Sequence, residues 1–173
     1  MAAISAAILM IPAICLFMAA ITDLFTMTIP NRLSIFLLAS FVVLAPVSGL
    51  PFAEISMSFA AGAIVFAVCL GFYALNVMGG GDVKLLASSA VWFGFSAALG
   101  AFILQTALLG GLVTLIVMLL RSQADRFAVI GSLVPEPILT TKKVPYGLAI
   151  GLAGLITFWN SPIAIAALAG LKQ

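Results

Sequence analysis

Charged side chains are scarce in this chain. Only 7% of its 173 residues are charged, against roughly 25% in an ordinary soluble domain, while 65% are apolar. So few charges cannot cover the surface of a soluble globule of this size, and a disordered chain would need the opposite composition. The sequence therefore predicts a polytopic membrane protein, and its net charge of +2 is too small to indicate nucleic-acid binding.

Histidine is missing altogether, and cysteine occurs only twice. The first absence excludes serine–histidine–aspartate triads, cysteine–histidine pairs and zinc sites built on imidazole. Cys15 and Cys69 both lie inside apolar runs and form no CxxC pair, which excludes a zinc knuckle or a thioredoxin-like site. We interpret the two thiols as packed apolar side chains and expect neither a metal nor a cofactor.

Long apolar runs predict six membrane helices. A helix needs about 20 apolar residues to cross the hydrocarbon core. Residues 85–120 are uncharged, and as one helix they would extend about 54 Å, well beyond a bilayer of about 30 Å. The chain must therefore fold back near Gly94 and Ser96, and Pro145 is placed to open the last helix. The predicted spans are residues 2–22, 33–49, 56–77, 82–93, 97–120 and 145–169.

Most basic residues fall on one side of these predicted spans. Cytoplasmic loops carry an excess of Lys and Arg, so this side is assigned to the cytoplasm and both termini to the opposite side. The sequence thus predicts an all-α, polytopic membrane protein in which residues 1–173 form a single transmembrane domain. Lys142 and Lys143 are expected to contact anionic lipid headgroups. Lys172 and Glu54 fall on the side opposite the cytoplasm. The cytoplasmic side carries Arg32, Lys84, Arg121, Arg126, Lys142 and Lys143.

Two aspartates lie at this predicted cytoplasmic boundary, where Asp23 ends the first span and Asp82 begins the fourth. Acids near hydrocarbon are costly, so they are candidates for function. Paired carboxylates can share a proton, one acting as base on a water and the other as acid toward a carbonyl. The alternative is that both are interfacial residues that pair with Arg32 and Lys84 or cap helix ends, and charge placement alone does not decide. Asp125 and Glu136 are interpreted as loop charges.

Three glycines precede the second aspartate, at positions 79–81. Each glycine costs about 1 kcal/mol inside a helix, so three in a row are expected to break it. They also leave no side chain beside Asp82, which would let a peptide backbone approach the acid. The alternative is a plain hinge between two spans. A phosphate-binding loop is excluded, because the GxxxxGK[ST] pattern is absent.

These motifs together resemble those of the type IV prepilin peptidases, which are intramembrane aspartic proteases. Their GxGDxK pattern is matched by residues 79–84, and an earlier aspartate followed by Ile-Pro-Asn is matched by Asp23 and residues 29–31. Residues 144–149, Val-Pro-Tyr-Gly-Leu-Ala, resemble a further motif of that family. The resemblance implies that Asp23 and Asp82 are the catalytic pair. It implies supporting roles for Pro30, Asn31, Gly79, Gly80, Gly81, Lys84, Pro145, Tyr146 and Gly147.

Plainer interpretations of three supporting residues stay open. Lys84 is placed either to orient Asp82 or to anchor the chain on the cytoplasmic side. Asn31 either closes the polar segment or forms a turn after Pro30. Tyr146 is either a donor to the site or an interfacial aromatic, and the second interpretation is favoured.

The resemblance also implies a substrate and a location. It implies removal of the short basic leader of prepilins and pseudopilins at the cytoplasmic face of the bacterial inner membrane, with membrane lipids and a pilus assembly machinery as further partners. The short length is similar to the tight-adherence (Flp) pilus peptidases of the CpaA/TadV type, although archaeal preflagellin peptidases are also short. Nothing corresponds to the N-terminal CxxC region of long members, so methyltransferase activity is expected to be absent.

Helix position suggests how the two acids divide their roles. Asp82 would lie near the positive N-terminal end of a helix and Asp23 near a negative C-terminal end, which makes Asp82 the base and Asp23 the acid in our hypothesis.

Two other classes of protein remain as alternatives: a proton-coupled transporter, and a non-catalytic membrane component of a pilus or secretion machine. A relay across the bilayer would need a charge near the midplane, and no predicted span carries one.

Overall fold

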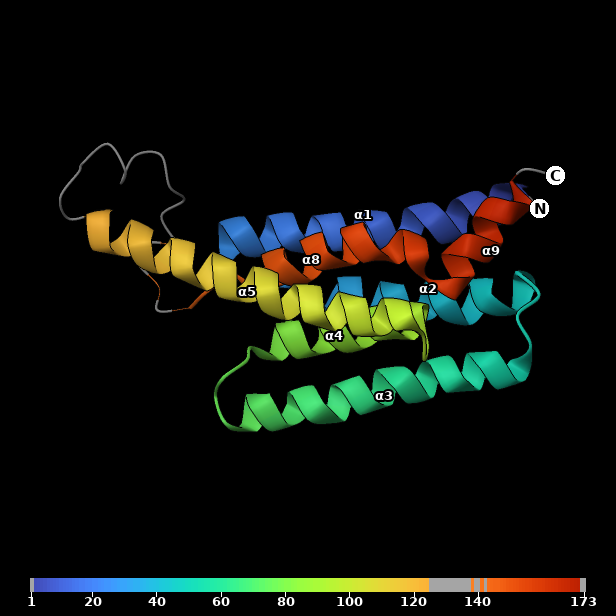
Figure 1. The fold of residues 1–173 in the computed structure, drawn as a ribbon, viewed down its shortest axis with the longest axis horizontal. Helices are drawn as coiled ribbons and strands as arrows, with labels where there is room; N and C mark the ends of the chain where they lie inside the picture. The colour runs from blue at the N-terminus through green and yellow to red at the C-terminus, as the bar shows by residue number, and fades with distance from the viewer. Residues whose placement is uncertain (1, 125–137, 139–140, 142, 172–173) are drawn as a thin grey trace.

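The computed structural model describes residues 2–124, 138, 141 and 143–171. Every regular element in this part of the chain is helical, as the composition predicted. The longer helices lie side by side along the long axis of the molecule, and the two chain ends lie together at one end (Figure 1). The helices are α1 (Ala2–Thr26), α2 (Asn31–Val47), α3 (Phe52–Ala74), α4 (Gly80–Phe93), α5 (Ala97–Ala124), α8 (Tyr146–Thr157), the 3-10 turn η1 (Phe158–Asn160) and α9 (Pro162–Gly170).

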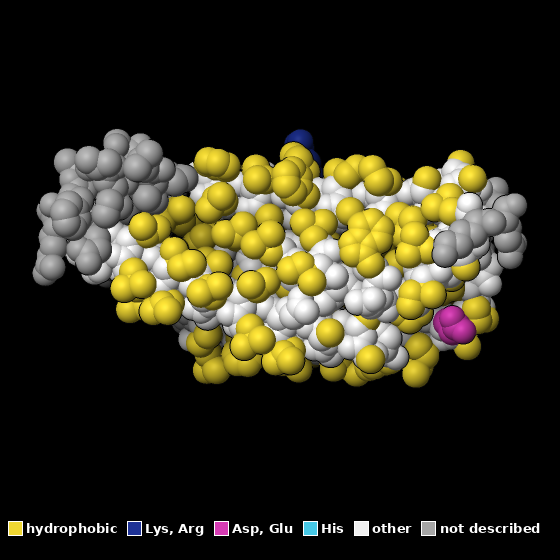
Figure 2. Space-filling view, turned by 45° about the horizontal axis from the view of Figure 1, so that its top comes forward, with side chains coloured by type: hydrophobic (Ala, Val, Ile, Leu, Met, Phe, Trp, Pro, Cys, Tyr) yellow, Lys and Arg dark blue, Asp and Glu magenta, His cyan; other side chains and the backbone are white. Residues whose placement is uncertain are grey.

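Three of these helices, α1, α3 and α5, are long and apolar enough to cross a membrane. Helices α8 and α9 pass the same test together, although they are bent by 54° at their junction. The 17 residues of α2 form a shorter apolar helix. Hydrophobic side chains are spread along the face drawn in Figure 2, and many large apolar residues are exposed, as expected of a surface in contact with lipid.

The first helix is longer than predicted. It continues to Thr26 instead of ending at residue 22, and the chain leaves the helix at Met27, which has φ = +52°. Thr22 Oγ1 donates to the Met18 carbonyl oxygen at 2.8 Å, and Thr26 Oγ1 donates to the Thr22 carbonyl oxygen at 2.7 Å. Asp23 thus lies within the last turn of α1, near the helix end where the sequence placed it.

The sequence predicted that glycines would break the helix both before and after α4, and the structure bears out the second break more fully than the first. The fold-back near Gly94 is confirmed: α4 ends at Phe93, and Gly94 has φ = +56°, a conformation that suits glycine. The break before Asp82 is confirmed only at Gly79, which precedes the helix. Gly80 and Gly81 form the first turn of α4 instead, so the expectation that all three glycines interrupt the helix is wrong.

The last predicted span is broken in two. The sequence predicted one helix over residues 145–169, but the helix begins at Tyr146 and is interrupted between Thr157 and Pro162. Pro162 has no N–H for a continuing helix, and the Ser161 hydroxyl accepts a hydrogen bond from the Ala164 N–H at 3.3 Å, which caps a new one. The Asn-Ser-Pro sequence at 160–162 is a signal that could have predicted this break.

Close helix contacts at small residues position the site. An added Cβ on Gly151 of α8 would lie 2.5 Å from the Leu16 carbonyl oxygen of α1. An added Cβ on Gly62 of α3 would lie 2.5 Å from Val91 Cγ2 of α4. Trp92 of α4 donates from Nε1 to the Leu37 carbonyl oxygen of α2 at 3.0 Å. Helix α4 is thus fixed against its neighbours, and α1 is fixed against α8.

The predicted charges at Asp125, Arg126, Glu136, Lys142 and Lys172 lie outside the described residues.

Candidate active site

Asp23 is held by a segment that is remote in sequence. Its side chain is 5% exposed, and Oδ2 accepts a hydrogen bond from the Gly147 backbone N–H at 2.7 Å. Gly147 is the second residue of α8, so the start of that helix lies directly against the carboxylate. A Cβ on Gly147 would lie 2.9 Å from Asp23 Oδ2 and 2.6 Å from Ile29 Cδ1. Only a residue without a side chain allows this approach.

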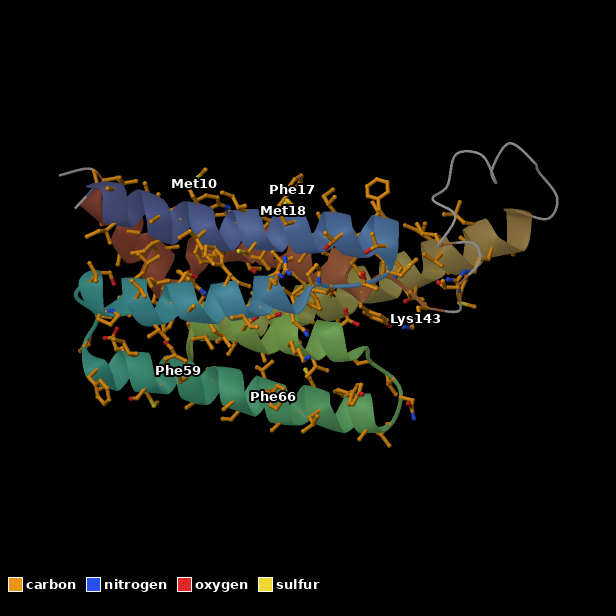
Figure 3. All side chains as sticks on the ribbon, turned by 180° about the vertical axis from the view of Figure 1, so that it is seen from behind. Met10, Phe17, Met18, Phe59, Phe66 and Lys143 are labelled. Carbon is orange, nitrogen blue, oxygen red and sulfur yellow. The ribbon has the colours of Figure 1, made fainter. Side chains whose placement is uncertain are left out.

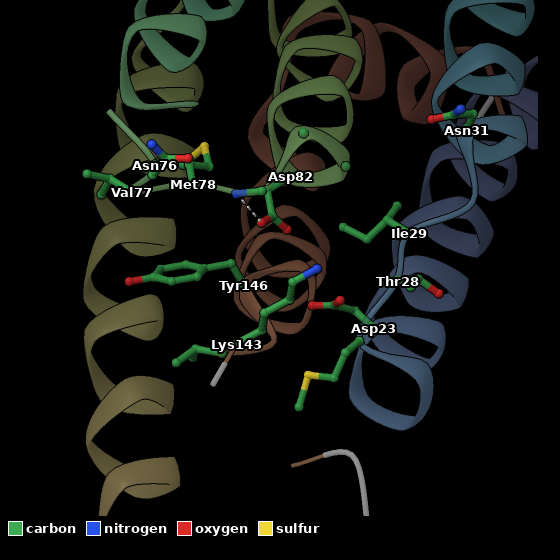
Figure 4. A pocket seen from close by; sticks show the side chains of 15 residues that line it. Asp23, Thr28, Ile29, Asn31, Asn76, Val77, Met78, Asp82, Lys143 and Tyr146 are labelled. Carbon is green, nitrogen blue, oxygen red and sulfur yellow. Dashed lines mark hydrogen bonds between the residues drawn. The ribbon is translucent and has the colours of Figure 1, made fainter. Parts of the chain in front are cut away.

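Asp82 is held by its own helix start. It is the third residue of α4, and its Oδ2 accepts the Gly79 backbone N–H at 3.2 Å, the dashed line in Figure 4. Its side chain is 8% exposed. A Cβ on Gly81 would lie 3.2 Å from Ile29 Cβ, so the absent side chain lets the first turn of α4 pack against the segment that follows α1. The same segment thus touches the supports of both acids.

Both aspartates border one cavity of about 550 Å³. Figure 4 shows the two carboxylates on facing sides of this space, with the Lys143 side chain extending between them. Asp82 interacts electrostatically with both Asp23 and Lys143. The cavity is lined by Asp23, Met27, Thr28, Ile29, Asn31, Asn76, Val77, Met78, Gly79, Gly80, Gly81, Asp82, Lys143, Val144 and Tyr146.

Backbone strain is concentrated at this cavity. Met27 and Asn76 have φ values of 52° and 57°, and within the described ranges no other non-glycine residue has a positive φ. Both line the cavity, one after the α1 aspartate and the other before the α4 aspartate. Such strained residues cluster at functional sites. Sequence reasoning missed both; asparagine tolerates this conformation, which is a weak signal for Asn76, whereas nothing marks Met27.

The residues expected to support the aspartates fall into two groups. Gly79, Gly80, Gly81, Asn31 and Tyr146 line the cavity, and Gly147 bonds Asp23 directly. The structure does not bring three others to the cavity wall. Pro30 and Pro145 precede the first residues of α2 and α8, and Lys84 donates from Nζ to Asn31 Oδ1 at 3.1 Å.

Two side chains have settings that differ from the favoured interpretation. Lys143, expected at lipid headgroups, lines the cavity. Tyr146 also lines it; its ring packs on Gly110, where a Cβ would lie 2.8 Å from the ring, and its hydroxyl oxygen accepts from Thr114 Oγ1 at 3.4 Å. Both contacts depend on α5 and α8 lying side by side, which no local pattern reveals.

The sequence predicted that Asp82 lies at a positive helix end and Asp23 at a negative one, and the structure does not show this difference. Asp82 lies in the first turn of α4, and Asp23 accepts its hydrogen bond from the first turn of α8. Both carboxylates therefore lie at the positive end of a helix. The prediction that Asp23 differs through its place near the end of α1 overlooked the second helix.

A metal centre is not formed by the residues that the structure describes. Among them, no three His, Cys, Asp or Glu side chains gather closely enough to hold an ion. Cys15 and Cys69 are buried free thiols, as the sequence predicted. The ionisable side chains in the described lining of the cavity are the two carboxylates, the Lys143 ammonium group and the Tyr146 phenol.

The fold and the cavity define a class of protein: a helical membrane protein with paired acids at one end of its bundle. The family model that matches the chain is that of the type IV leader peptidase family, over residues 10–119. This is more than half of the sequence and includes both aspartates. The chain belongs to the type IV leader peptidase family. Comparisons with curated proteins and with solved structures give no match.

Proposed function

We propose that this protein is an intramembrane aspartic endopeptidase that removes the basic leader from prepilins and pseudopilins. The observation that supports this proposal is the convergence of Asp23 and Asp82, from α1 and α4, on one cavity. Family membership supplies the reaction class, leader cleavage. The cavity supplies two acid–base groups with which peptide hydrolysis can proceed without a metal.

The mechanism uses the two carboxylates as a pair. One removes a proton from a water that attacks the scissile carbonyl, and the other donates its proton to the carbonyl oxygen. The first then passes the water's proton to the leaving nitrogen, and the second recovers its proton as the carbonyl of the new acid forms. The Gly147 and Gly79 N–H groups each fix one carboxylate oxygen, so both acids are oriented before substrate arrives. A peptide backbone would reach the acids through the cavity of about 550 Å³ that both carboxylates line.

Family membership supports a leader peptide as the ligand. With one aspartate protonated, as the mechanism requires, the charge of the other is balanced by Lys143, the described base in the cavity lining. The predicted topology places this end of the bundle at the cytoplasmic face of the bacterial inner membrane. In that topology α2 and α4 also cross, giving six spans with both termini on the outer side. The tight-adherence (Flp) pilus form, CpaA/TadV type, is the subtype we propose.

Cleavage of a prepilin tests the proposal. The detergent-solubilised protein is incubated with a prepilin that carries its leader, and the product is identified by mass spectrometry. We expect one cut at the leader boundary, and none after Asp23→Asn or Asp82→Asn. Glu54→Gln is the matched control, because this exposed acid lies in the first turn of α3, away from the cavity, and its variant should cleave normally. Cleavage that persists in both aspartate variants would refute the mechanism.

A further inference from the structure

A second concavity opens on the side of the bundle, between α2 and α3, with α4 as its floor. It has a volume of about 460 Å³. We define this groove by the residues that line it: Asn31, Ser34, Ile35, Leu38, Phe59, Gly62, Ala63, Phe66, Lys84, Ala87, Ser88 and Val91. Phe59 and Phe66, labelled in Figure 3, belong to the wall contributed by α3.

Polarity changes along the groove in a definite order. Its end nearest the aspartate cavity carries Lys84 and Asn31, and Asn31 lines both concavities. Ser34 lies one turn further along α2, which is a rise of about 4.5 Å for three residues. Beyond Ser34 the walls are hydrocarbon, contributed by Leu38, Phe59 and Val91. A glycerophospholipid would complement this order, in which a cation is followed by a hydroxyl group and then by an apolar channel.

The polar groups at this end have unused bonding capacity. The described hydrogen bond of Lys84 goes to the neutral amide oxygen of Asn31, so its charge is not neutralised there. An ammonium group has three donors, and at least one is therefore available to an anion. The Ser34 hydroxyl oxygen has no hydrogen-bond partner although its side chain is only 5% exposed. Rotation about the Cα–Cβ bond of Ser34 moves its hydroxyl group to another staggered position.

We propose that the groove binds one anionic glycerophospholipid, with its phosphate on Lys84, an ester carbonyl on Ser34 and an acyl chain along α2 and α3. Opposite charge favours this ligand over a zwitterionic lipid, because the choline group would bring a second cation near Lys84. The site is separate from the aspartate cavity and does not depend on peptidase activity.

Lipid retention by the full chain tests the proposal. The protein is extracted from vesicles containing equal amounts of phosphatidylglycerol and phosphatidylcholine with the same acyl chains, and bound lipids are counted by native mass spectrometry. We expect one phosphatidylglycerol to be retained about fivefold over phosphatidylcholine, the size of the attraction of one Lys to an anionic lipid surface. Equal retention of the two lipids would overturn the proposal.

Four variants locate the site. Lys84→Gln should abolish the preference for phosphatidylglycerol, whereas Arg32→Gln removes a neighbouring exposed cation outside the groove lining and should preserve it. Ala63→Phe fills the groove and should lower retention, whereas Ala60→Phe adds the same bulk to an exposed position of α3 outside the lining and should not. An unchanged preference in Lys84→Gln, or unchanged retention in a folded Ala63→Phe variant, would refute the site.

A photoreactive benzophenone side chain at position 63 identifies the occupant in whole membranes. An adduct with the mass of phosphatidylglycerol supports the proposal. An adduct with a prepilin or with a second copy of this chain would assign the groove to a protein helix and overturn it. Because neither readout uses peptide cleavage, failure here leaves the proposed peptidase activity unaffected.

Discussion

The two aspartates of the cavity are held in different ways. Asp82 accepts its hydrogen bond from Gly79, three residues earlier in the same helix start. Asp23 accepts its bond from Gly147, which is 124 residues away in sequence and opens a different helix. One support is therefore local, and the other exists only when α1 and α8 pack together. Disturbing long-range packing should affect Asp23 first, whereas Asp82 should respond mainly to changes in its own turn.

The largest effect is expected from Gly147→Ala, which breaks the long-range support. The new Cβ would lie 2.9 Å from Asp23 Oδ2 and 2.6 Å from Ile29 Cδ1, so the carboxylate or the helix start must move. Displacement of a reacting group by about 1 Å lowers rates about 100-fold, and we expect a loss of that size in kcat for prepilin cleavage. Gly111→Ala is the control, because its Cβ would meet no atom within 4 Å. A normal rate in Gly147→Ala would contradict the proposed role of this contact.

The local support is tested by comparing two variants of Gly79. This residue has φ = −73°, which proline also adopts, so Gly79→Pro removes the N–H donor without changing that angle. Gly79→Ala keeps the donor but adds a Cβ 2.8 Å from Asp82 Oδ2, a crowding that the proline variant shares, so the two variants differ in the N–H group. A hydrogen bond to a charged group contributes about 1.5–3 kcal/mol, so kcat/KM for the proline variant should be at least about tenfold below that of the alanine variant. Equal rates would show that the Gly79 bond does not position Asp82.

Packing between α1 and α8 is tested by Gly151→Ala. Its Cβ would lie 2.5 Å from the Leu16 carbonyl oxygen, which forces the two helices apart. Overpacking of this kind costs about 1–3 kcal/mol, so thermal unfolding in detergent should shift to lower temperature. Cleavage should fall by a smaller factor than in Gly147→Ala, since the added Cβ meets Leu16 and Ala20 instead of the Asp23 carboxylate. Gly100→Ala, which meets nothing within 4 Å, should leave both measurements unchanged.

The smallest effect is expected from Trp92→Phe, far from both supports. The change removes the 3.0 Å hydrogen bond from Nε1 to the Leu37 carbonyl oxygen while keeping an aromatic ring in the core. Hydrogen bonds between membrane helices contribute about 0.6 kcal/mol on average, so unfolding should shift slightly. The cleavage rate should not change. A large loss of activity in this variant would mean that the α2–α4 contact also positions Asp82.

The sequence predicted what local patterns encode. Apolar runs and the glycine at position 94 were enough to place α2, α4 and α5 to within a few residues. The glycines before Asp82 marked the support of that acid, because donor and acceptor are close in sequence. Family resemblance and the matching family model agree on the peptidase class.

Other features depend on tertiary contacts and had no local signal. The Gly147–Asp23 bond and the entry of Lys143 into the cavity require α8 to lie against α1. Other misses have local causes that hydropathy does not reveal. Helix α1 runs past Asp23 to a left-handed Met27, and the Ser161 cap with Pro162 divides the last helix.

The central claim is that Asp23 and Asp82 work as one unit, and a double-mutant comparison tests it most directly. Single-turnover prepilin cleavage is measured for the wild type, Asp23→Asn, Asp82→Asn and the double variant. Groups that act together are strongly non-additive, so each single variant should lose as much activity as the double variant. Substantial cleavage by either single variant, or a double variant whose loss equals the product of the two single losses, would contradict the account.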